Sequence, residues 1–220
     1  MRFRVIAVGA VSGFLFAAGS FAGTVDVISN GSFETPIVSG AFQQFPTSVP
    51  GWTGSAGIEI QTNGSLGAGQ GTPFGNQYAE LAVEQDSTYS QTVTTTPGGT
   101  YNLSFYFSAR PGTGTNTVSV GFTGSSDVSF DTPDTGSVKF LQFTHAFVAT
   151  GAQSVLSFTP VNTPHLGGGD LLDNVTVTTE TGGPSAVPIP AAVWTGMSGL
   201  VGLSTIGFCR QLLRRKGQRG

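Results

Sequence analysis

Asp173 is the residue most in need of a chemical partner, because it lies in a late run of alternating apolar side chains. It is in phase with Val175 and Val177, so the alternation predicts that its carboxylate points towards the core. A buried carboxylate is costly unless it is paired or bound to a cation, and oxygen-rich, charge-poor surroundings suit Ca²⁺. One interpretation is therefore a structural calcium ion. The other is that Asp173 caps a turn with Asn174 and binds no metal.

Four side chains are candidates for recognising a sugar, which is bound by aromatic faces with polar groups nearby. Tyr106 points away from the Phe-rich face of its strand, and Trp52 and Tyr78 are further candidate platforms. Arg110 could bind a polar ligand. Each has a structural alternative: Trp52 is favoured as a core anchor, Tyr106 could pack under a loop, and Arg110 is favoured as half of an ion pair.

Catalysis has little support in the sequence. Glycoside hydrolysis needs two carboxylates flanking the scissile bond, which Glu59, Glu80 and Glu84 could supply, but nothing in their spacing fixes a separation. His145 shares a face with apolar neighbours, which favours a core histidine over a general base. No spacing typical of a zinc site or of a catalytic triad is present in the sequence, so we expect no enzyme.

Charge is distributed very unevenly along the 220 residues. Seven of the nine basic residues lie at the two ends, and all twelve acidic residues fall between Asp26 and Glu180. The middle of the chain retains only Arg110 and Lys139, which gives it a net charge of −10. Such a surface repels phosphate backbones, so nucleic acid is excluded as a partner.

Short alternating segments separated by Gly and Pro turns predict how these side chains are positioned. About nine strands are expected, without a helical period, and they favour an all-β antiparallel sandwich, a jelly roll, over residues 23–181. The expected strands are Val25–Ile28, Ile58–Thr62, Tyr78–Val83, Tyr89–Val93, Tyr101–Ala109, Val118–Phe122, Leu141–Phe147, Val155–Thr159 and Leu172–Thr178.

The first 22 residues have the features of a secretory signal peptide. Arg2 and Arg4 precede an uncharged apolar run, and Ser20-Phe21-Ala22 offers small residues for a signal peptidase. The run is short for a membrane span, which favours cleavage after Ala22 over an uncleaved anchor or a buried helix. We therefore expect export.

The C-terminal residues 182–220 have the features of a membrane anchor. Residues 182–190 form a Pro/Gly linker, and residues 191–209 are 19 uncharged residues, long enough to cross a bilayer as a helix. Basic residues concentrate in the following segment, 210–220, and the positive-inside bias predicts that this tail is cytoplasmic. The alternative for 191–209 is a buried helix of a soluble protein.

The linker, the apolar segment and the basic tail together resemble the PEP-CTERM sorting signal of Gram-negative and related bacteria. The motif residues are Val187, Pro188, Ile189 and Pro190, and Ile189 stands where the name-giving motif has Glu. The resemblance implies an exosortase-like sorting enzyme and the membrane as partners. It places the domain at the cell envelope or surface, either anchored or released after processing.

A second resemblance covers nearly the whole domain between the ends. Its motifs include Asn30-Gly31-Ser32-Phe33-Glu34, Pro50-Gly51-Trp52 and Asp170-Leu171-Leu172-Asp173-Asn174-Val175, in that order. They are similar to those of bacterial choice-of-anchor domains and of a group of plant cell-wall proteins, which resemble galactose-binding-like jelly rolls. The resemblance implies a calcium ion tying the first strand to the last, with Asn30, Glu34 and Asp173 at the matching positions.

These observations predict a surface-displayed, non-catalytic binding module with extracellular polysaccharide as its ligand class. The first alternative is a structural or adhesive component of the envelope or biofilm matrix without a small-ligand site. A weaker alternative is a glycan-acting hydrolase.

Overall fold

The computed structural model describes residues 23–82, 84–161 and 168–180. All the regular elements in this part of the chain are β-strands, thirteen in number, and they form one compact unit. The signal peptide, the sorting motif Val187–Pro190 and the apolar segment 191–209 lie outside the described residues. Within those residues, no helix is long and apolar enough to span a bilayer.

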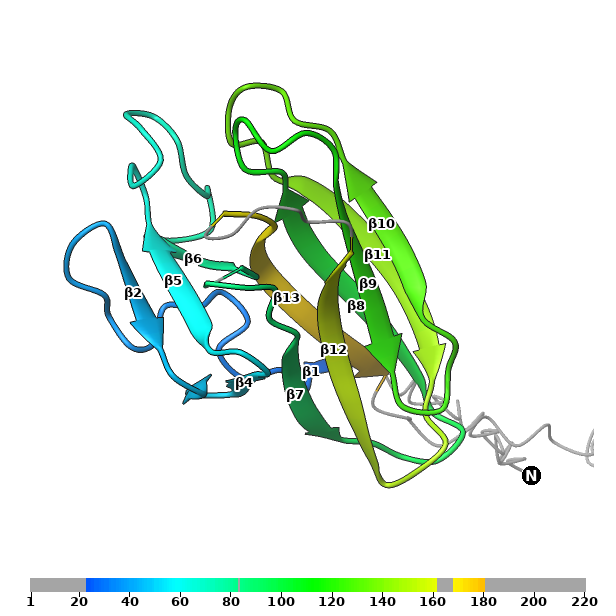
Figure 1. Ribbon diagram of the computed structural model, residues 1–220. Helices are drawn as coiled ribbons and strands as arrows, with labels where there is room; N and C mark the ends of the chain where they lie inside the picture. Colours follow the sequence, from blue (N-terminus) through cyan, green and yellow to red (C-terminus); the bar gives the residue numbers. More distant parts are fainter. Residues whose placement is uncertain (1–22, 83, 162–167, 181–220) are drawn as a thin grey trace, which may run out of the picture. The chain divides into compact units, whose positions relative to one another are not determined.

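The strands form two antiparallel sheets that face each other (Figure 1). In the figure, β9 and β12 lie in front of β8 and β13. The seven-stranded sheet has the order β11 (Leu141–Val148), β8 (Thr100–Ser108), β13 (Leu171–Glu180), β6 (Gln77–Glu80), β5 (Ile58–Thr62), β2 (Phe42–Phe45), and β1 (Thr24–Asp26) also pairs with β13. The six-stranded sheet has the order β10 (Val128–Thr132), β9 (Asn116–Phe122), β12 (Gln153–Val161), β7 (Tyr89–Thr94), β4 (Trp52–Gly54), β3 (Ser48–Val49).

The all-β antiparallel sandwich is confirmed, and the core between its sheets is aromatic. Phe105 of β8 meets Phe158 of β12 edge to face, with ring centroids 5.2 Å apart. Trp52 stacks on Phe33 and tilts against Phe158. Such rings bury large apolar areas, so alternation in β8 and β12 directs one apolar side chain in two towards the facing sheet.

Each of the nine expected strands overlaps an observed strand, and four observed strands were not expected. These four are β2, β3, β4 and β10. They have two to five residues each, too few for a period-two pattern to stand out from the surrounding loops.

Candidate functional site

The polar residues of interest gather on the outer face of the seven-stranded sheet, the face turned away from the core. Ile58, Ile60 and Ala79 of β5 and β6 belong to the core, so the residues alternating with them face outward. These outward residues are Glu59, Gln61, Tyr78 and Glu80, and all four are at most 5% exposed. Polar side chains on an outer face are normally solvated, so their burial shows that loops cover this part of the sheet.

The strand register brings two carboxylates together. Glu59 and Glu80 are directly paired across β5 and β6. One amide nitrogen, Nε2 of Gln61, donates to Oε1 of Glu59 at 2.5 Å and to Oε2 of Glu80 at 2.6 Å. Gln44 of β2 donates to the other oxygen of Glu59 at 2.8 Å. Burial and, secondarily, the charge of Glu80 raise the pKa of Glu59 to about 7.

Arg110 pairs with Glu80, as the ion-pair interpretation expected. Its guanidinium Nη1 donates to Oε1 of Glu80 at 2.6 Å, and the backbone N–H of Gly169 donates to the same oxygen at 2.7 Å. Glu80 is fully buried, and a buried carboxylate is costly unless it is paired, so the contact with Arg110 offsets part of that cost.

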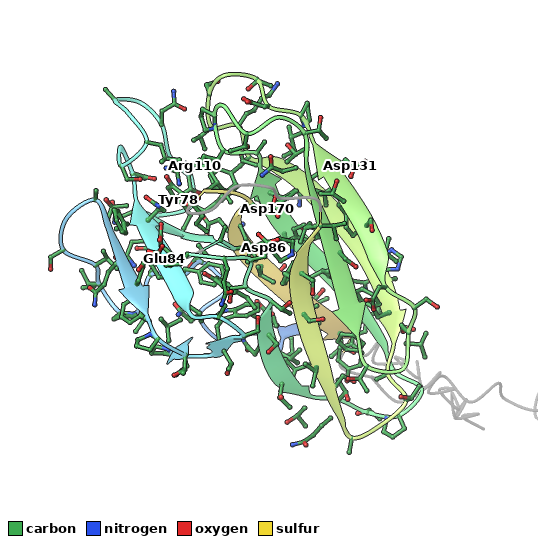
Figure 2. The ribbon with its side chains drawn as sticks, in the orientation of Figure 1. Tyr78, Glu84, Asp86, Arg110, Asp131 and Asp170 are labelled. Carbon is green, nitrogen blue, oxygen red and sulfur yellow. The ribbon has the colours of Figure 1, made fainter. Side chains whose placement is uncertain are left out.

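A pocket of about 330 Å³ opens over this cluster. We call it the Glu59 pocket. Phe42 of β2 is 52% exposed and lies across from Gln61 in the strand register, so it presents an aromatic ring at the pocket. Figure 2 shows Tyr78, Glu84 and Arg110 around β5 and β6, whereas Asp131 lies on β10 in the other sheet. The pocket is lined by Ala41, Phe42, Gln44, Glu59, Gln61, Ser65, Leu66, Glu84 and Arg110.

Two other hollows lie along the Gly-rich loop between β5 and β6. Their volumes are about 490 and 550 Å³, and neither has an aromatic ring among its lining residues. The Glu59 pocket combines an exposed ring with charged and amide groups, which is the composition that binds polar ligands specifically. It is therefore the candidate site.

The structure corrects the assignment of two predicted stacking platforms. Trp52 is 1% exposed, and its indole N–H donates to the backbone oxygen of Asn30 at 3.0 Å. Tyr78 is fully buried, with its hydroxyl 3.1 Å from that of Ser65. Neither ring has a free face for a sugar. Trp52 is a core anchor, which was the favoured alternative.

Tyr106 also lacks a free face. It lies on the outer side of β8, as predicted, but the ring of Phe74 packs on it with centroids 4.0 Å apart. It therefore packs under a loop, the structural alternative. His145 is half-buried against the ring of Phe147, with centroids 4.7 Å apart, in the apolar setting that the sequence predicted.

Asp173 is fully buried, but on the opposite face from the one predicted. It pairs with Tyr106, whereas Leu172 and Val175 belong to the core. The register shifts between Asp173 and Thr176, and a β-bulge of this kind reverses the alternation. The carboxylate accepts hydrogen bonds from Thr72 Oγ1 and from the N–H of Asn174, and burial raises its pKa to about 7.

The three residues of the predicted calcium site have different roles. Glu34 lies close enough to Asp173 for its charge to raise the pKa of Asp173 further. The amide of Asn30 is used by its own loop: Oδ1 accepts from Thr35 N, and Nδ2 donates to two carbonyl groups. The predicted calcium site therefore retains two carboxylates with mutual charge repulsion, Glu34 and Asp173, while the side chain of Asn30 is committed to its own loop. In the described ranges, no group of three or more His, Cys, Asp or Glu could hold a metal.

The fold and the pocket define a class: an all-β sandwich with an acidic, partly aromatic pocket on an outer sheet face. Residues 26–178 match the family described as "Protein of unknown function (DUF642)", and the chain belongs to that family. No curated protein matches the chain.

Several solved structures share the general architecture. TmCBM61 in complex with β-1,4-galactotriose is 16% identical with a TM-score of 0.45, covering 70% of this chain and 97% of that chain. The CBM22-1 xylan-binding domain of Paenibacillus barcinonensis Xyn10C is 12% identical with a TM-score of 0.44, covering 64% and 94%. The enzymatically active domain of bacteriophage CBA120 tailspike protein 4 is 15% identical with a TM-score of 0.43, and the match spans 70% of this chain but only 21% of the tailspike domain. These likenesses are too distant to bear on ligand or activity.

Proposed function

We propose that this chain is an exported bacterial surface protein whose β-sandwich is a non-catalytic, polysaccharide-binding module of galactose-binding-like jelly-roll type. The observation that carries the binding proposal is the Glu59 pocket, where the exposed ring of Phe42 stands beside Glu59, Gln61 and Glu84. An aromatic face stacks on the apolar side of a sugar ring, and carboxylate and amide groups accept hydrogen bonds from its hydroxyls.

Export and anchoring rest on the two ends of the chain. The apolar run before Ala22 supports a signal peptide, and residues 182–220 support a PEP-CTERM-like tail processed by an exosortase-like enzyme. The ligand would then be a polysaccharide outside the cell.

The pair formed by Glu59 and Glu80 does not have the arrangement expected of a glycoside hydrolase. Glu59 and Glu80 lie side by side on neighbouring strands and share one amide donor. A hydrolase needs its two carboxylates on either side of the scissile bond. This geometry supports binding without catalysis.

Affinity electrophoresis of the purified full-length protein, in gels that each contain one polysaccharide, tests the proposal. Retardation by one glycan class is expected. Phe42→Ala should weaken it about tenfold, because burying a phenylalanine side chain is worth about 1.5–3 kcal/mol. Val148→Ala is the matched control: Val148 is also 52% exposed but lies on β11, so its loss should leave mobility unchanged.

The other outcomes separate the alternatives. If no polysaccharide in a broad panel retards the protein, the binding module is refuted and the structural or adhesive role is favoured. If reducing ends are released from a retarding glycan, the hydrolase is favoured.

A further inference from the structure

The hydrogen-bonding groups of the Glu59 pocket are mostly acceptors. Gln61 is 2% exposed, and its Nε2 is already committed to Glu59 and Glu80. Its other amide atom, Oε1, is buried without a hydrogen-bond partner among the described residues. An unpaired buried acceptor destabilises the protein, so a ligand that donates a hydrogen bond to it relieves that cost on binding.

The pocket also carries a net negative charge. Glu59 and Glu84 line it, and Glu80 accepts a hydrogen bond from the lining residue Gln61. Arg110 is the basic side chain among the lining residues, and its guanidinium is held by buried Glu80 at 2.6 Å. An anionic sugar such as a uronic acid would meet like charge here, which is costly in a partly desolvated site.

Resting on the proposed function, we infer that the Glu59 pocket binds an amino sugar through its free, protonated amine. An ammonium group offers three donors and no acceptor, which complements Gln61 Oε1 and the carboxylates of Glu59 and Glu84. The exposed ring of Phe42 adds a surface for the sugar ring or the cation.

A bare divalent cation fits this pocket less well than an ammonium group. Ca²⁺ takes six to eight oxygen ligands. Within residues 23–82, 84–161 and 168–180 no group of three or more acidic, His or Cys side chains could hold a metal. Calcium alone is nevertheless a necessary arm of the test.

Protonation of Glu59 gives the binding a characteristic pH dependence. Its pKa is about 7 in the free protein, and Glu80 from β6, Gln44 from β2 and the loop residues Glu84 and Arg110 surround it. Between pH 5 and pH 7 the fraction of ionised Glu59 rises, and the ionised form attracts an ammonium group. The amine of an amino sugar loses its proton near neutrality, so affinity for it should pass through a maximum between pH 5 and pH 8, whereas affinity for an uncharged sugar should not.

Calorimetric titration of the full-length protein with three β-1,4-linked tetramers tests the inference. The tetramers of glucosamine, N-acetylglucosamine and glucose differ only in the substituent at carbon 2. The glucosamine tetramer should bind about tenfold tighter or more, as one charge-assisted hydrogen bond is worth about 1.5–3 kcal/mol. Its advantage should shrink at high salt and should be greatest at a pH between 5 and 8, where Glu59 is partly ionised and the amine is still partly protonated.

Glu84→Gln gives a variant that should fold, because Glu84 is exposed. It should reduce binding of the glucosamine tetramer about tenfold and leave the other two tetramers unaffected. The matched control is Glu180→Gln, the same change at an exposed residue at the far end of β13, which should alter nothing.

Failure of the inference can be distinguished from failure of the proposed function. If the three tetramers bind equally, or if none binds while a polysaccharide still retards the protein, the amino-sugar inference is overturned and the proposed glycan-binding function is retained. If calcium chloride alone binds saturably and Glu84→Gln abolishes that binding, the pocket is a metal site and the amino-sugar inference is overturned. If no tetramer binds and no polysaccharide retards the protein, both proposals fall.

Discussion

At the scale of single residues, Asp170 is a carboxylate in an unfavourable environment for its charge. It is fully buried, and apart from a weak interaction with the amide of Asn116, which lowers its pKa, neither carboxylate oxygen has a hydrogen-bond partner within the described residues. Burial, followed by the charges of Asp86 and Glu80, raises its pKa from 3.8 to about 7. The folded protein therefore favours the protonated form of Asp170, and the unfolded chain does not.

This raised pKa predicts that Asp170→Asn becomes more stabilising as the pH increases. The contribution of protonated Asp170 is complete below pH 3.8 and is lost as the pH rises towards 7. An amide never ionises, so the variant escapes this loss. Relative to the unmodified protein, its free energy of unfolding should gain roughly 3 kcal/mol between pH 5 and pH 8.

Urea unfolding of both proteins at the two pH values measures this difference. Asp131→Asn is the control, since Asp131 is exposed on β10 and should show no such gain. A constant difference between Asp170→Asn and the unmodified protein would contradict a raised pKa at Asp170.

Some site residues could be inferred from sequence and others could not. The ion pair of Arg110 was foreseeable because basic residues are scarce, but its partner Glu80 comes from a strand 30 residues earlier. Phe42 gave no signal, since its four-residue strand carries Gln43 and Gln44 between two phenylalanines. Only the pairing of β2 with β5 shows that its ring lies beside the pocket.

At the scale of elements, the sequence predicted long strands well and failed at an irregularity. The nine-residue alternation of β8 has the phase that the pattern predicted. In β13 the bulge reverses the phase, with Asn174 in the left-handed region at φ 46°, so Asp173 and Val175 face opposite sides. Alternation alone does not reveal a bulge, because the extra residue changes no residue type.

The Asn30–Glu34 motif has a packing explanation at this bulge. Gly31 accepts a backbone hydrogen bond from Val175 at 2.9 Å, and a Cβ atom on Gly31 would lie 1.9 Å from the carbonyl oxygen of Val175. Phe33, two residues on, is fully buried in the core. The motif therefore joins the start of the domain to its last strand.

Because backbone opposes backbone there, Gly31→Ala should be strongly destabilising. We expect a loss of about 1–3 kcal/mol or more in the free energy of unfolding, as is typical of overpacking that a backbone must move to relieve. Gly151→Ala is the control, since its Cβ would come no closer than 3.4 Å to a neighbour. Chemical denaturation should separate the two variants, and equal stabilities would contradict the close approach.

At the scale of the whole molecule, the strongly acidic charge of the domain bears on how the start of the domain is held to its last strand. The stretch between Asp26 and Glu180 carries a net charge of −10, so cations are its natural partners. Glu34 lies before the first long strand and Asp173 lies in the last one. The carboxylate of Glu34 already accepts from the N–H groups of Asn76 and Gln77 at 2.8 and 2.9 Å.

We therefore predict that calcium stabilises the protein through Glu34 and Asp173, and carbonyl oxygens must complete the ligand set because no third acidic, His or Cys side chain joins these two within the described residues. At a concentration about 100-fold above its dissociation constant, calcium would add about 2.7 kcal/mol, which raises Tm by roughly 5–10 °C in a domain of this size. Thermal unfolding of the full-length protein in calcium chloride and in chelator measures the shift.

Asp173→Asn should abolish this calcium-dependent shift in Tm, and Asp131→Asn should preserve it. Identical Tm values with calcium and with chelator would mean that hydrogen bonds from Thr72 and Asn174 suffice to hold Asp173, and that the first and last strands need no ion between them.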